Sequence, residues 1–147
     1  MRNWRVLVVL TVVLGIAGCN SGSARQVTTI DEVEETLDLA SISEIVCDYH
    51  HGPPPLFSSG VRYSRYIKIS GPEHVDAAIA ELEAHGFVRI GERTEFIQLD
   101  GPKDVLATIE VIAPPDDRIG TTFPTPKNEK CEIPDEGVTG IRLSLPS

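Results

Sequence analysis

Hydrophobic residues recur at helical spacing in two segments of this 147-residue chain. The first segment opens with Thr29-Ile30-Asp31-Glu32, which has the form of a capping box, so we expect a helix to begin there. The second follows Gly71-Pro72 and ends at Gly86, and these residue types are favoured at the two ends of a helix. Each segment forms one apolar stripe beside acidic positions. The stripes are Ile30, Val33, Leu37 and Ala40, and then Val75, Ala78, Ile79 and Leu82.

Alternation of apolar and polar residues predicts strands in other parts of the chain. The predicted strands cover residues 61–69, 87–99 with an interruption at Gly91, 105–111 and 138–145. Residues 41–47 fit either a short helical turn or a strand, and residues 114–136 have the composition of a long loop. A turn over residues 100–104 predicts that the strand after it closes a hairpin. This order of elements favours an α+β fold, a two-layer sandwich with two helices on one face of a mostly antiparallel sheet of about four strands.

The first twenty residues differ from the rest of the chain. Two arginines precede an almost wholly apolar run over residues 6–16, and two small residues lead into Cys19. This arrangement is typical of a secretory signal peptide, and the run is shorter than the ~20 residues that a membrane-spanning helix needs. We therefore divide the chain into a signal peptide over residues 1–18, a flexible Ser/Gly-rich tether over 19–28 and a single domain over 29–147.

The end of this signal is more specific, because Ile16-Ala17-Gly18-Cys19 resembles the lipobox of bacterial lipoprotein precursors. The resemblance implies that the Cys19 thiol carries a diacylglyceryl group and that a peptidase cuts just before it. Two acyl chains hold a protein stably on a membrane, at ~0.8 kcal/mol per buried CH₂ group. An ordinary signal peptide with an incidental cysteine is the alternative. With four lysines against nine arginines, the chain is also similar to small lipoproteins of high-GC Gram-positive bacteria, a likeness that implies no activity.

The distribution of charge adds to this interpretation. Two of the 13 basic residues precede Cys19 and all 22 acidic residues follow it, so the mature chain, with 11 basic residues, has a net charge of −11. Anionic lipid and nucleic acid both repel so acidic a body. We therefore expect no nucleic-acid partner, and we expect the lipid to attach the protein to the extracytoplasmic face of the cell membrane.

The cysteines point to the same compartment. If Cys19 carries lipid, Cys47 and Cys131 remain as a pair where disulfides can form. Closing a loop of ~85 residues would stabilise the fold by roughly 4–5 kcal/mol in the chain-entropy model. We expect this disulfide, and two separate buried thiols are the alternative.

The densest cluster of metal-ligand side chains is Cys47-Asp48-Tyr49-His50-His51. Asp48, His50 and His51 are candidate ligands for Zn²⁺ or Cu²⁺. Adjacent histidines on an extended chain point to opposite sides, however, and no H-E-x-x-H or C-x-x-C spacing occurs. The sequence therefore favours solvated histidines, and we expect no metal and no other cofactor. It also contains no G-x-S-x-G elbow, which favours a protein that is not an enzyme.

Residues 62–68 interleave basic and aromatic side chains on this acidic chain. Such a stretch could stack sugars or bind an anionic glycan. Structural roles are favoured instead: Tyr63 would pack into the core, and the basic side chains, Arg65 and Lys68 among them, would pair with acids of a neighbouring strand or helix.

Together these features favour a lipid-anchored, non-enzymatic envelope protein that binds another protein or an envelope component. Two alternatives remain. One is a small extracytoplasmic metal-binding or hydrolytic protein that uses Asp48, His50 and His51. The other is an inhibitor or immunity-type lipoprotein whose acidic surface meets a basic partner.

Overall fold

A computed structural model describes residues 21–52, 63–93, 95–125 and 130–146 of the chain. The α-helices are α1 (Ser21–Glu34) and α2 (Val75–Ala84), and short 3₁₀ turns occupy Leu39–Ser41, Pro72–His74 and Pro102–Asp104. The strands are β1 (Ile45–His51), β2 (Ser64–Ser70), β3 (Val88–Arg93), β4 (Phe96–Asp100), β5 (Leu106–Ile112), β6 (Thr122–Pro124), β7 (Lys130–Glu132) and β8 (Val138–Ser144). Within these ranges no helix combines the length and the apolar character needed to cross a membrane. The lipobox and Cys19 lie outside the described residues.

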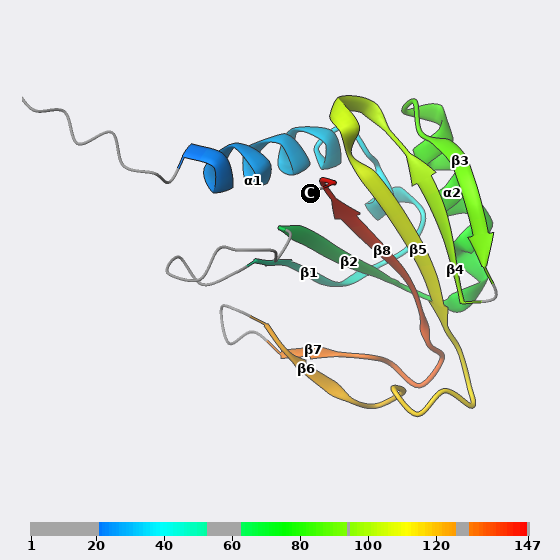
Figure 1. Ribbon diagram of the computed structural model, residues 1–147. Helices are drawn as coiled ribbons and strands as arrows, with labels where there is room; N and C mark the ends of the chain where they lie inside the picture. The colour runs from blue at the N-terminus through cyan, green and yellow to red at the C-terminus, as the bar shows by residue number, and fades with distance from the viewer. Residues whose placement is uncertain (1–20, 53–62, 94, 126–129, 147) are drawn as a thin grey trace, which may run out of the picture.

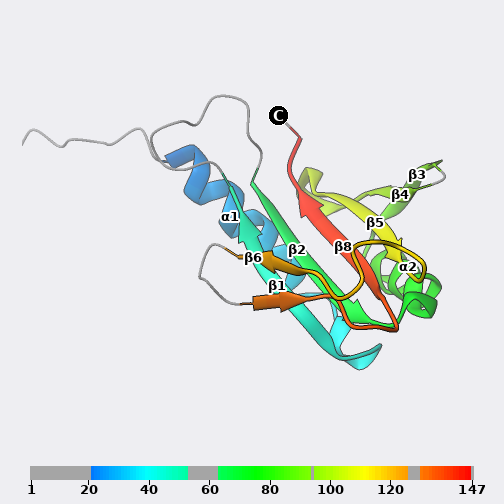
Figure 2. The ribbon, with the colours of Figure 1, turned by 90° about the horizontal axis from the view of Figure 1, so that it is seen from below.

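Six of the strands form one open sheet in the order β1-β2-β8-β5-β4-β3, and every neighbouring pair is antiparallel. Strands β6 and β7 form a separate hairpin (Figure 1). Both helices pack on one face of the sheet, and the hairpin lies on the other face, as the view in Figure 2 shows. The predicted α+β class, with two helices on one face of an antiparallel sheet, is confirmed. The sheet has six strands, whereas we expected about four.

The main core fills the space between the helices and the sheet. Its members alternate along the strands, because successive side chains of a strand point to opposite faces. Fully burying one such aliphatic side chain contributes about 1.5–3 kcal/mol. The principal core residues are Ile30, Val33, Ile79 and Leu82 from the helices and Ile67, Ile69, Leu99, Ile109, Ile141 and Leu143 from the sheet.

The second helix agrees with its prediction and the first differs from it. Helix α2 buries the expected stripe, and Gly86 follows it with a positive φ of 88°. Helix α1 begins at Ser21, so it includes part of the segment that we expected to be a flexible tether. Thr29 therefore lies inside the helix, where its hydroxyl donates to the carbonyl oxygen of Arg25 at 2.9 Å and forms no capping box. Because α1 ends at Glu34, the helical spacing does not reach Ala40, which is exposed.

The additional strands come from segments whose pattern was ambiguous or polar. Residues 41–47, whose pattern fits either a helical turn or a strand, include the first three residues of β1. The interrupted stretch over residues 87–99 is a hairpin of β3 and β4, with a bulge between Arg89 and Gly91. The expected loop over residues 114–136 contains β6 and β7, whose three residues each are too few to show an alternating pattern.

The β6–β7 hairpin is held to the sheet by a small second core and by one covalent bond. Ile112, Ile133 and Val138 are buried between the sheet and the segments around the hairpin. The predicted disulfide between Cys47 of β1 and Cys131 of β7 is confirmed, with a Cα–Cα distance of 5.4 Å and a sequence separation of 84. This bond fixes a short hairpin that buries little apolar surface of its own.

We expect the double variant Cys47→Ala/Cys131→Ala to unfold with a free energy lower by about 2–5 kcal/mol, because its unfolded chain is no longer cross-linked over a long loop. Urea denaturation with and without a reducing agent measures this difference. The reductant should weaken the wild-type protein and leave the double variant unchanged. Equal stabilities of the oxidised wild type and the variant would contradict the expectation.

Candidate functional site

Strand β1 separates the three candidate metal ligands. Asp48 and His50 pair with Ile67 and Arg65 and so face the helices, whereas His51 faces the other side. His50 Nε2 lies 2.6 Å from Asp31 Oδ1 of helix α1. The structure therefore does not bring the three side chains together, and none of the described residues form a group of three metal-ligating side chains.

Asp48 instead takes part in an ion-pair network centred on Arg65. The Nε and Nη2 atoms of Arg65 donate to the two carboxylate oxygens of Asp48 at 2.9 and 2.7 Å. Its Nη1 atom lies 2.9 Å from both Asp31 and Glu34 of α1. The hydrogen bond to Asp48 raises the pKa of Arg65, and burial raises the pKa of Glu34 although the guanidinium opposes it. The expected pairing of Arg65 with acids of a strand and a helix is confirmed, and it joins α1 to the sheet.

The sheet face that points away from the helices carries a different set of side chains, which we call the polar sheet face. The strand register places one row of side chains across five strands and a shorter row beside it. The first row is Tyr49, Tyr66, Arg142, Thr108 and Gln98, and the second contains Lys68, Gly140 and Glu110. The rings of Tyr49 and Tyr66 stack, with their centroids 5.3 Å apart. Aromatic, cationic and acidic groups therefore share one surface.

Gly140 allows the second row to form an ion pair across the central strand. Lys68 Nζ lies 3.5 Å from Glu110 Oε1, although β8 runs between their strands. A Cβ atom at Gly140 would lie 3.0 Å from Glu110 Cγ, so a larger residue would crowd the glutamate side chain. The side chain of Lys68 is only 6% exposed, and its amine also lies 5.8 Å from the ring centre of Phe123. The expected pairing of Lys68 with an acid of another strand is thus confirmed.

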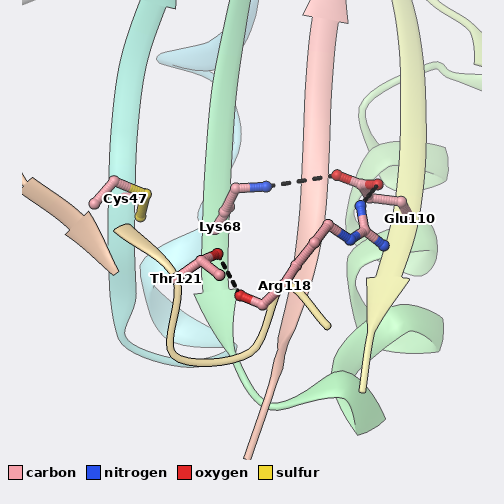
Figure 3. The surroundings of a disulfide bond; sticks show 6 residues. Cys47, Lys68, Glu110, Arg118 and Thr121 are labelled. Atoms are coloured by element: carbon pink, nitrogen blue, oxygen red, sulfur yellow. Dashed lines mark hydrogen bonds and ion pairs between the residues drawn. A yellow bond between two sulfur atoms is a disulfide. The ribbon is translucent and has the colours of Figure 1, made fainter. Parts of the chain in front are cut away.

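Arg118 extends this network from the segment between β5 and β6 (Figure 3). Its Nη1 atom donates to Glu110 Oε2 at 3.0 Å, while Nε and Nη2 donate to the carboxylate of Asp116 at 3.0 and 2.8 Å. Hydrogen bonds from the side chain and backbone of Arg118 lower the pKa of Asp116 to about 2. Glu110 therefore lies between two cations whose positions other contacts fix.

Most of the side chains described above line a groove of about 870 Å³, namely Tyr66, Lys68, Thr108, Glu110, Asp116, Arg118 and Arg142. The groove also takes in the β3–β4 hairpin, where the Arg93 guanidinium lies 5.6 Å from the ring centre of Phe96. Groups of both charges line it, and Tyr66 and Phe96 supply aromatic surface. Such a mixture can orient a polar ligand by hydrogen bonds and pack against its apolar part.

Tyr66 and Lys68 belong to the basic and aromatic stretch that the sequence singles out, but no sequence pattern pointed to Glu110, Arg118 or Arg142. One signal was present, since Arg142 stands between Ile141 and Leu143 in an alternating segment, where it would point to the face opposite the core. Comparison of the chain with known protein families, curated proteins and solved structures finds no match. The geometry of the groove is therefore the basis for a functional proposal.

We expect Arg118→Gln to raise the pKa of Asp116 from about 2 toward its ordinary value of 3.8, because the substitution removes the guanidinium donors. In the wild type the folded pKa lies below the unfolded value, so the contribution of this carboxylate to stability is present above pH 3.8 and lost as the pH falls through about 2. NMR titration of the Asp116 carboxyl carbon measures the shift. Arg89→Gln, which removes an exposed pair with Glu92 at 3.8 Å, is the control and should leave Asp116 unchanged. An Asp116 pKa that is the same in both variants would contradict the expectation.

Proposed function

We propose that this chain is a lipid-anchored extracytoplasmic binding module that holds a component of the cell envelope in the groove of the polar sheet face. The observation that carries the proposal is the groove itself. Helices cover one face of the sheet, and the opposite face, beside the part that the β6–β7 hairpin covers, carries a charged and aromatic groove of about 870 Å³. Ligand pockets have volumes of roughly 300–1,000 Å³, and polar groups in them orient the ligand.

The location rests on two independent features of the chain. The Cys47–Cys131 disulfide suits an oxidising compartment, since disulfides are rare in the cytosol. The residues before Cys19 resemble a lipobox, which would place lipid at the start of the mature chain. Export to the extracytoplasmic face and anchoring there would account for both features.

The groove is suited to hold a ligand because its central side chains are already fixed. Glu110 is bound by Lys68 and Arg118, and Arg118 is bound in turn by Asp116. Side chains that are ordered before binding lose little conformational entropy when the ligand arrives. Hydrogen bonds from Arg118 lower the pKa of Asp116, so this carboxylate is ionised and paired at neutral pH. These contacts support binding rather than catalysis.

The anchor is tested by intact-mass spectrometry of protein extracted from cells. We expect a mature chain that begins at Cys19 and carries acyl groups. We expect Cys19→Ser to lack the acyl groups and to keep residues 1–18, because a serine at this position has no thiol to carry the lipid. Cys47→Ser, which removes a cysteine of the disulfide and leaves the lipobox intact, is the control and should be acylated and cut at Cys19 as the wild type is. An unmodified Cys19 on a mature chain would disprove the anchor.

The groove is tested by a photo-reactive residue placed at Thr108 and irradiated in intact cells. We expect a cross-linked envelope component at this position, since Thr108 lies in the middle of the first row. The matched control carries the same residue at Glu83, which is exposed on helix α2 on the opposite side of the sheet. Identical products at the two positions, or no product at Thr108, would contradict the proposed site.

A further inference from the structure

Two arginines of this protein bind a carboxylate in the same way. Arg65 uses its Nε and Nη2 atoms to hold both oxygens of Asp48, at 2.9 and 2.7 Å. Arg118 uses the same two atoms to hold both oxygens of Asp116, at 3.0 and 2.8 Å. Paired N–H donors along this edge of the guanidinium match the geometry of a carboxylate.

Arg142 presents the same edge without a carboxylate. Its Nη2 atom lies 3.4 Å from the hydroxyl oxygen of Thr108, at the limit of a hydrogen bond. Its Nε atom is buried and contacts no acceptor among the residues that the structure describes. A charged donor that is left buried and unpaired is costly, so a ligand that satisfies it gains free energy on binding.

The nearest ion pairs do not supply the missing group. Glu110 lies beside Thr108 on the same face, two residues along β5, but Lys68 and Arg118 already hold its two oxygens. Asp116 is held by Arg118. Arg142 itself is partly exposed and lines the groove, but its Nε atom is enclosed, so a ligand pairs with Nε only once the guanidinium turns toward the groove.

We propose that Arg142 is the anchor of a carboxylate-binding subsite, in which a ligand carboxylate pairs side-on with Nε and Nη2 of this residue. The register places Tyr66 next to Arg142 on β2, so the part of the ligand beyond the carboxylate packs against an aromatic side chain. The ligand class is a small organic acid that carries a ring beside its carboxylate. The inference rests on the proposed function, because it uses the same groove.

Benzoate is the probe, and benzamide, which has the same shape and no charge, is its matched control. We expect benzoate to shift the Arg142 Nε–Hε NMR signal saturably and benzamide to leave it unchanged. In Arg142→Lys, which keeps the charge but lacks the paired donors, the Tyr66 ring signals should report a dissociation constant at least about tenfold higher. Arg89→Lys, at an exposed arginine, should bind benzoate as the wild type does.

Four results would overturn the subsite: no shift with benzoate, an equal shift with benzamide, unchanged affinity in Arg142→Lys, or phosphate binding as tightly as benzoate. A fifth would be a change of the free Arg142 signal in Glu95→Gln or Asp117→Asn, since these groove residues would then already supply its acceptor. The comparison of benzoate with benzamide needs no variant, so it decides the question even if Arg142→Lys does not fold. If cross-linking at Thr108 succeeds and benzoate does not bind, the binding module stands and this subsite falls.

Discussion

The pairing of β8 on both of its sides determines how the two faces of the protein are built. Ile67 of β2 and Ile109 of β5 both lie opposite Ile141 of this strand. Because side chains alternate along a strand, Ile141 packs toward the helices while its neighbours Gly140 and Arg142 face the groove. A slip of one residue would turn Arg142 into the apolar core and Ile141 into the groove. The core and the candidate site therefore depend on a single register.

The parts of the fold that follow a strong local pattern could be predicted from the sequence. Helix α2 has a clear apolar stripe, with Gly71-Pro72 before it and Gly86 after it. The disulfide could be predicted because Cys47 and Cys131 remain as a pair when Cys19 carries lipid. The β3–β4 hairpin was harder, because the bulge near Gly91 interrupts the alternation. The β6–β7 hairpin has no alternation to detect, since a covalent bond and a small second core hold it in place.

The candidate site was harder to predict from the sequence, because its residues become neighbours only through the order of the strands in the sheet. Lys68 and Glu110 are 42 residues apart in sequence and meet across a glycine of a third strand. The cluster of Asp48, His50 and His51 shows the opposite case, in which residues adjacent in sequence are divided between two faces of the sheet. The basic and aromatic stretch supplied Tyr66 and Lys68 to the groove, while Arg65 in the same stretch serves to attach helix α1.

The position of the disulfide has a consequence for survival in a compartment that contains proteases. Cys47 lies in the first strand and Cys131 in the seventh of the eight described. The bond therefore closes a loop that contains strands β2 to β6 and helix α2. A backbone cut anywhere in this interval leaves two fragments that are still one molecule. The fragments stay at the high effective concentration of tethered partners, so a nicked protein can keep its sheet assembled.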